Sequence, residues 1–97
     1  MKTLEDYIAI SAKRRRGGID FFTKLETIEI LKLCKSLKKE LLGIDGFFLT
    51  STTTQPSMDN SIDYSAGSSS HIKNVYKHAI EFITSRPNDM YFEIVWR

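Results

Sequence analysis

The C-terminal quarter of this 97-residue chain changes its hydrophobic period once, and that change constrains the fold more than any other feature. Apolar residues from Ile72 to Ile83 fall on one helical face, which predicts a helix that Pro87 ends. Apolar residues then occupy every second position, which predicts a strand with one buried face: Met90, Phe92, Ile94 and Trp96. A helix and a strand joined by a short polar connection are typical of an α+β domain.

The N-terminal segment predicts a short helix over residues 3–15. Thr3 and Asp6 have the spacing of a capping box, with Asp where Glu or Gln is usual. One side of the helix carries Leu4, Tyr7, Ile8 and Ala12, and Gly17-Gly18 follows it. We expect this helix to be either part of the domain or an appendage to it.

A second helix is indicated by the capping box of Thr23 and Glu26. Its apolar residues recur at spacings of three and four, as in a core-facing stripe: Leu25, Ile28, Leu31, Cys34, Leu37 and Leu41. We expect this helix to end at Gly43 or just before it.

The middle of the chain predicts two strands and a loop. Residues 41–50 are typical of a strand with a bulge at Gly43 or Gly46. Residues 50–60, rich in Ser and Thr, predict a loop or a hairpin connection, and residues 61–65 alternate as a short strand does. The prediction is one α+β domain over residues 1–97, with three helices packed on a small, mostly antiparallel sheet of three to four strands.

Composition excludes several classes of protein. The one cysteine, Cys34, cannot build an internal disulfide framework, and no apolar run reaches the ~18–20 residues that span a bilayer. Glu5 and Asp6 lie where a signal peptide is uncharged. We therefore expect a cytoplasmic, soluble protein that does not enter membranes.

No catalytic or cofactor motif is found in the sequence. Cys34 lies on a helical core stripe, where a thiol packs as a small hydrophobe rather than as a nucleophile. His71 and His78 are seven residues apart, whereas helical metal ligands are usually three or four apart. Gly43 and Gly46 lack the Lys-Ser/Thr of a phosphate-binding loop. We expect no enzyme activity, no cofactor and no metal.

The run Lys13-Arg14-Arg15-Arg16 is the one nucleic-acid signal in the sequence. Four adjacent cations can neutralise phosphates, but no aromatic residue for base stacking is interleaved with them. A small nucleic-acid-binding protein that uses Lys13–Arg16 is therefore the alternative function.

Charge is distributed unevenly along the chain. Residues 1–42 carry a net +4 and residues 43–97 a net −2, and no Lys or Arg occurs from residue 41 to residue 71. That stretch combines carboxylates with large apolar side chains, namely Asp45, Asp59 and Asp63 with Phe47, Phe48, Met58 and Tyr64. Such a surface suits a basic protein partner. The alternative is a solvated loop whose aromatic residues belong to the core.

The chain resembles a known family over about its last two-thirds. Leu42-Gly43-Ile44-Asp45-Gly46 follows an amphipathic helix, Ser61–Ser65 carries Ser, Asp and an aromatic residue, and Tyr91–Val95 forms a terminal strand after a further helix. This order resembles the immunity proteins of tRNA-cleaving colicins and of contact-dependent growth inhibition toxins. The first helix and Lys13–Arg16 have no counterpart there.

The resemblance implies a non-enzymatic inhibitor in bacterial competition, which covers the nucleic-acid cleft of a cognate nuclease toxin, here an RNase. The residues expected on or beside the toxin-facing surface are Asp45, Phe47, Met58, Asp59, Asp63 and Tyr64. Strand edges in such a sheet also permit a homodimer.

Overall fold

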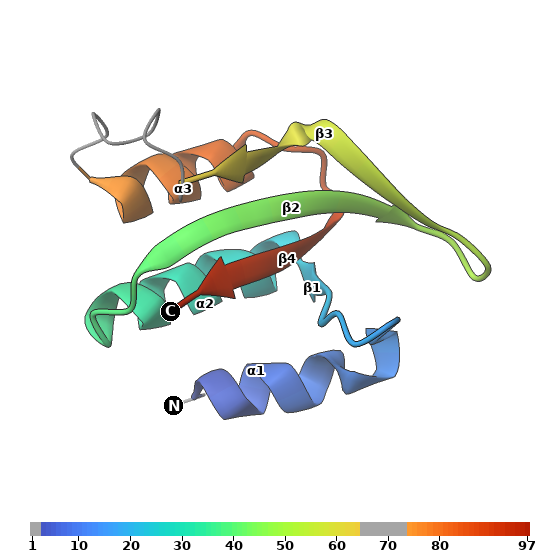
Figure 1. Ribbon diagram of the computed structural model, residues 1–97, viewed down its shortest axis with the longest axis horizontal. Helices are drawn as coiled ribbons and strands as arrows, with labels where there is room; N and C mark the ends of the chain where they lie inside the picture. The colour runs from blue at the N-terminus through green and yellow to red at the C-terminus, as the bar shows by residue number, and fades with distance from the viewer. Residues whose placement is uncertain (1–2, 65–73) are drawn as a thin grey trace.

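The computed structural model describes residues 3–64 and 74–97 (Figure 1). The elements follow one another as α1 (Leu4–Ser11), the 3₁₀ turn η1 (Ala12–Arg14), β1 (Phe22–Thr23), α2 (Lys24–Ser36), β2 (Leu41–Leu49), β3 (Thr54–Asp63), α3 (Val75–Thr84) and β4 (Tyr91–Trp96). The predictions for Ser65, His71 and Ile72 lie outside the described residues. None of the described helices is long and apolar enough to cross a bilayer.

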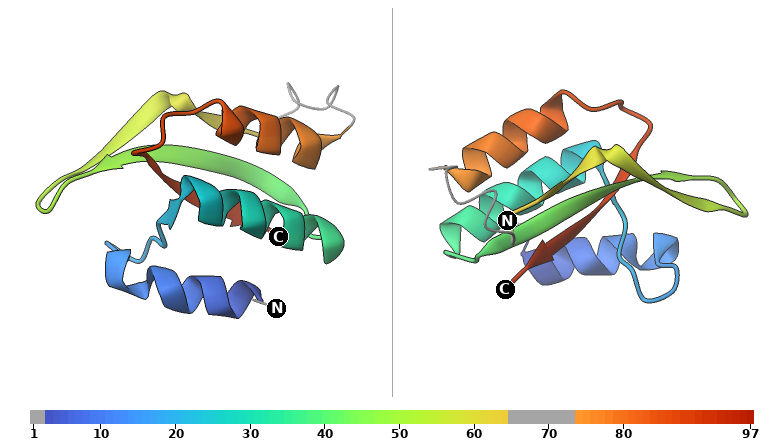
Figure 2. Two further views of the ribbon diagram at one scale, coloured as in Figure 1. Left: turned by 180° about the vertical axis from the view of Figure 1, so that it is seen from behind. Right: turned by 45° about the horizontal axis from the view of Figure 1, so that its top comes forward.

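Four strands form one antiparallel sheet in the order β1-β4-β2-β3. Helices α2 and α3 cover one face, because β2 and β4 lie in front of α2 in Figure 1 and behind it in the reverse view of Figure 2. The predicted fold class is thus confirmed, an α+β fold with three helices and four strands. Strand β1 was not predicted, because two residues are too short to show a period.

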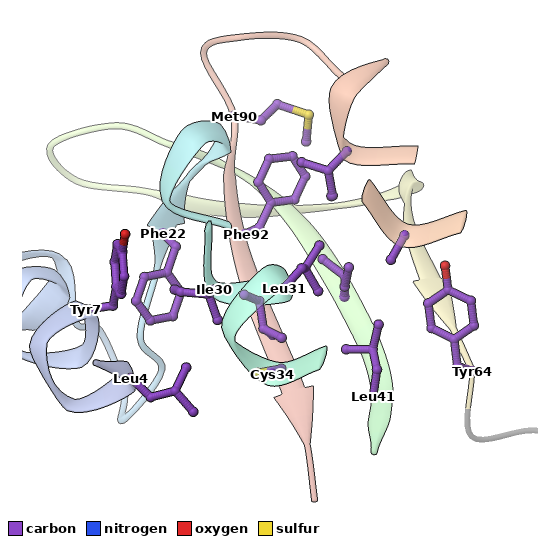
Figure 3. Close-up of a cluster of buried hydrophobic side chains, with 14 residues drawn as sticks. Leu4, Tyr7, Phe22, Ile30, Leu31, Cys34, Leu41, Tyr64, Met90 and Phe92 are labelled. Atoms are coloured by element: carbon purple, nitrogen blue, oxygen red, sulfur yellow. The ribbon is translucent and has the colours of Figure 1, made fainter. Parts of the chain in front are cut away.

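The main core lies between the helices and the sheet (Figure 3). Met90, Phe92 and Ile94 project into it from β4, as the alternating pattern predicted. Leu4 and Tyr7 of α1 belong to the same buried cluster, so the helix that could have been an appendage contributes to the core. Both predicted capping boxes are present, with Thr3 and Thr23 at the two N-caps.

The buried stripe of α2 differs from the predicted one. Thr27 and Ile30 are buried with Leu31 and Cys34, whereas Leu25 is 76% exposed and Leu37 is 55% exposed. Leu25 lies in the first turn on the solvent side, and Leu37 lies beyond the last helical residue. On α1, Ser11 is buried in place of the predicted Ala12, because its hydroxyl donates to the Ile8 carbonyl and to Asp20 Oδ1.

Helix α2 ends at Ser36, seven residues before the glycine that was expected to end it. Lys38 adopts φ +58° in the left-handed region. The Lys39 amide donates to the Cys34 carbonyl and the Lys38 amide to the Lys35 carbonyl, which is the Schellman pattern. A lysine thus takes the place where glycine is usual, which is why the end of the helix at Ser36 was not predicted.

Residues 50–60 contain the connection of a hairpin, one of the two predicted alternatives, but the connection is shorter than expected because residues 54–60 form a strand. Only Thr50–Thr53 turn, and β3 pairs with β2 from Thr54 onward. Residues 54–60 are exposed or half-buried on an edge strand, so they show no alternation of apolar and polar residues. Their composition is therefore that of a loop. The end of this β2–β3 hairpin extends beyond the helices (Figure 1).

Candidate protein-binding face

One face of the sheet is covered by none of the helices formed by residues 3–64 and 74–97, and we call it the open face. Along β4 the core residues Phe92 and Ile94 alternate with Glu93 and Val95, which therefore lie on the open face. Asp45 pairs with Glu93, and Gly43 pairs with both Val95 and Asp63. The open face is thus formed by side chains of the three strands β2, β3 and β4.

Two carboxylates face each other at the centre of the open face. Asp45 on β2 and Glu93 on β4 are directly opposite in the strand register. Burial raises the pKa of Glu93, and the nearby carboxylates of Asp45 and Asp20 raise it further. Within residues 3–64 and 74–97, neither Asp45 nor Glu93 forms an ion pair, whereas Asp20 binds Arg15 at 2.6 Å. Like charges directly opposite destabilise a sheet, so this arrangement is a local weakness.

A bulge in β3 displaces the chain at Met58 and Asp59. Between Ile44 and Gly46 the register advances two residues on β2, whereas the partners Ile62 and Ser57 are five apart on β3, which leaves three extra residues. Met58 is 85% exposed there, the largest exposed fraction among the described large apolar side chains. A thioether exposed to this extent is an adaptable contact for a partner.

The bulge is held by specific contacts. Gly46 donates its backbone N–H to Ser61 Oγ at 2.9 Å, and Ser61 Oγ donates to the Ser57 carbonyl at 2.7 Å. Asn60 Nδ2 donates to Ser57 Oγ, and the Arg86 guanidinium donates to Asn60 Oδ1 and to the Asp59 carbonyl. The register between β2 and β4 also shifts between Leu41 and Gly43, so each glycine lies beside an irregularity, although the extra residue on β2 is Leu42 and the larger bulge belongs to β3.

A hollow of about 460 Å³ lies on the open face beside the bulge. The residues around it include Leu42, Gly43, Asp45, Met58, Asp63 and Val95. It therefore brings together three of the six residues predicted to bind a partner, namely Asp45, Met58 and Asp63. Asp59 is exposed on the bulge but does not line the hollow.

The two predicted aromatic anchors are buried, so for them the alternative of a core position holds. Phe47 is 8% exposed and packs edge-on against Phe21, with ring centroids 4.9 Å apart. Tyr64 is also 8% exposed, and its hydroxyl lies 2.7 Å from His78 Nδ1, which links the end of β3 to α3. Burial raises the pKa of Tyr64 to about 12. Neither ring can anchor a partner without leaving its present contacts.

The open face also includes three residues that were not among the predicted binding residues, namely Leu42, Glu93 and Val95. The alternation in residues 90–97 showed that Glu93 and Val95 share a face opposite the core. That pattern could not show that β2 pairs with β4, since the two strands are separated by β3 and α3 in the chain. The register that places Glu93 beside Asp45 is visible only in the structure.

The basic run is occupied by contacts within the protein. Arg14 forms an ion pair with Glu26 and donates to the Phe21 carbonyl at 3.1 Å, and Arg15 binds Asp20. Arg16 donates to the Thr50 and Thr53 carbonyls at 2.6 and 2.7 Å and to Thr54 Oγ1 at 3.1 Å. Arg14 and Arg16 thus connect the segment after α1 to Phe21, to α2 and to the hairpin.

The sequence analysis also considered a cysteine nucleophile and a metal site. Cys34 is fully buried, and burial raises its thiol pKa to about 11. Within the part of the chain that the structure describes, no group of three or more His, Cys, Asp or Glu residues could hold a metal ion. No protein-family model, curated protein or solved structure matches the chain. The resemblance to immunity proteins therefore stays a prediction.

Proposed function

We propose that this chain is an immunity protein that binds a cognate bacterial nuclease toxin through its open face and blocks the toxin's active site. The observation that carries the proposal is the Asp45–Glu93 pair, two carboxylates opposite each other with no ion pair among the described residues. The repulsion between the two carboxylates lowers the stability of the free protein. A cationic group of a basic partner placed between them would attract both.

A nuclease cleft is the kind of partner that fits this charge. Such a cleft is basic because it holds phosphates, so an inhibitor with carboxylates on a rigid sheet can take the place of the nucleic-acid backbone. The chain segment that contributes Asp45, Asp59 and Asp63 contains no opposing charge of its own, since no Lys or Arg occurs from residue 41 to residue 71. Met58 offers an exposed apolar contact beside the carboxylates. An interface of about 1,200–2,000 Å² would be expected.

The first experiment is co-expression. Immunity genes lie next to their toxin genes, so the open reading frame upstream of this gene is expressed in a bacterium with and without the chain. We expect the upstream product to kill and the chain to rescue growth. Killing without rescue would contradict the proposal, and so would turnover of a small substrate by the purified chain.

The second experiment locates the binding face. Asp45→Asn with Glu93→Gln removes two charges from the open face, and Asp59→Asn with Asp63→Asn removes two charges from β3. Both double variants should weaken toxin binding, most strongly at low salt, while circular dichroism shows an intact fold. The matched control is Glu81→Gln on α3, behind the sheet, which should bind as the parent does.

The alternative function, nucleic-acid binding through Lys13–Arg16, is less well supported than toxin inhibition because of the contacts that the arginines make. Arg14, Arg15 and Arg16 all use their guanidiniums within the protein, so phosphates would have to compete with Glu26, Asp20 and the hairpin carbonyls. Recovery of RNA or DNA from the lysate at low salt, lost on Arg14→Ala, would favour the alternative.

A further inference from the structure

We infer that the hollow on the open face receives a single lysine or arginine side chain of the partner. This inference rests on the proposed function for the identity of the partner, but not for the chemistry of the hollow. The partner's cationic side chain would enter at one point, the hollow, whereas the proposed function requires only that the whole face be acidic.

The shape of the hollow follows from three features of the strands. Gly43 contributes no side chain between Val95 on one side and Asp63 on the other, so the centre of the face is low. The bulge places Met58 at the rim. The resulting hollow of about 460 Å³ is large enough to receive one long side chain such as lysine or arginine.

The lining has two chemical parts. Leu42, Met58 and Val95 supply apolar contacts, and Asp45 and Asp63 supply carboxylates from neighbouring strands. A lysine or arginine has the same two parts, an apolar stem of three or four methylenes and a cationic end. The stem can pack on the apolar residues while the cation reaches Asp45, which forms no ion pair within residues 3–64 and 74–97.

Other occupants fit less well. A neutral apolar side chain would bury Asp45 without a partner, and an anion would be repelled by the Asp45 carboxylate. A second copy of this chain docked by the same face would place Asp45, Asp63 and Glu93 against their own counterparts. The chemistry of the hollow therefore selects a cationic side chain of another protein.

The hollow can be tested without a toxin by titration followed through amide NMR shifts. The probes are N-acetyl-arginine amide and N-acetyl-lysine amide, and N-acetyl-norleucine amide is the control with a stem but no charge. We expect the cationic probes to shift Gly43, Asp45 and Val95 at millimolar concentration, and Asp45→Asn to abolish these shifts. Absent shifts, or equal shifts at Asp59 and Asp89, would overturn the inference.

Once the toxin is known, two single variants that each remove one charge distinguish insertion of a side chain into the hollow from general electrostatic attraction. Asp45 lines the hollow, whereas Asp59 is exposed on the same bulged surface but does not line it. We expect Asp45→Asn to weaken binding at least tenfold more than Asp59→Asn does. Val95→Phe, which fills the hollow without changing charge at an exposed position, should also weaken binding at least tenfold.

The outcomes distinguish the two proposals. Equal, small losses for Asp45→Asn and Asp59→Asn, with no effect of Val95→Phe, would overturn the insertion and leave an acidic inhibitor face in place. Absence of any toxin binding by the parent chain would overturn the proposed function, while the amide titration would still decide whether the hollow binds a cation. Urea unfolding of each variant shows whether the fold has been kept.

Discussion

A Cβ atom on Gly46 would lie 2.4 Å from the carbonyl oxygen of Asn60 and 2.9 Å from Met90 Cε. The β3 bulge thus approaches the backbone of β2 so closely that only glycine fits between it and the core. We predict that Gly46→Ala lowers the free energy of unfolding by about 3 kcal/mol, the upper range for overpacking, because the nearest atom is backbone and cannot rotate away. Urea unfolding measures the loss.

The control for Gly46→Ala is the other glycine of the same strand. A Cβ on Gly43 would lie 3.1 Å from the Ile62 carbonyl oxygen, a distance that a small shift relieves. Gly43→Ala should therefore destabilise the protein clearly less. Equal losses for the two variants would mean that the contact with Asn60 does not decide the effect.

Lys38 is expected to be a site of stabilisation. Its φ of +58° is unfavourable for a residue with a Cβ, by about 1–2 kcal/mol, and glycine avoids this penalty but has more freedom to lose in folding. We predict that Lys38→Gly raises the free energy of unfolding by about 0.5–1 kcal/mol. Lys38→Ala should leave it nearly unchanged, and Lys35→Gly inside α2 should lower it by about 1 kcal/mol.

Arg16 is expected to stabilise the end of the hairpin. Its guanidinium donates to the Thr50 and Thr53 carbonyls, and the Thr50 amide donates to the Thr53 carbonyl at 3.0 Å. We predict that Arg16→Ala increases hydrogen exchange of the Thr50 and Thr53 amides about tenfold, as expected for the loss of roughly 1.4 kcal/mol. Arg15→Ala, which loses only the contact with Asp20, should leave exchange in the hairpin unchanged.

The raised pKa of Glu93 predicts a specific pH dependence. Because the folded state holds this proton more tightly than the unfolded chain does, the contribution of Glu93 to stability falls as pH rises from 4.5 through the folded pKa. Glu93→Gln should therefore gain stability over the parent at pH 7, by about 0.2–1 kcal/mol, and lose this advantage below pH 4. Thermal melts across this range measure the difference, and Glu81→Gln should show no such trend.

Cys34 should react slowly with thiol reagents. The side chain is fully buried, and with a pKa of about 11 only on the order of one thiol in a thousand is ionised at pH 8. We predict that its labelling by a disulfide reagent follows the global unfolding rate and accelerates in urea. The variant Cys34→Ala with Leu37→Cys, whose new thiol lies at an exposed position, should react within seconds in the native state.

The elements that were predicted correctly are those whose sequence pattern depends only on contacts within the element or with its own cap. The capping boxes at Thr3 and Thr23 and the alternation of residues 90–97 are local, and all are present. The end of α2 could not be predicted, because Lys38 takes a conformation that lysine rarely adopts. Tertiary pairing, rather than local preference, turned residues 54–60 into a strand.

The candidate site was predicted in part. The acidic stretch without Lys or Arg pointed to Asp45, Met58 and Asp63, which the structure places around one hollow. The sequence could not tell exposed from buried apolar residues, so Phe47 and Tyr64 were included and Val95 was not. The pairing of Asp45 with Glu93 depends on contacts between distant parts of the chain, which no local pattern encodes.

The bulge in β3 also interrupts the outer edge of the sheet. An exposed edge strand invites other chains to add to it and so begin fibrils. Here the outer edge is divided at Met58–Asn60, and Pro56 removes one amide hydrogen from the segment before it. An invading strand could follow only a few residues before losing alignment. The distortion that shapes the open face thus also limits the addition of another strand to this edge.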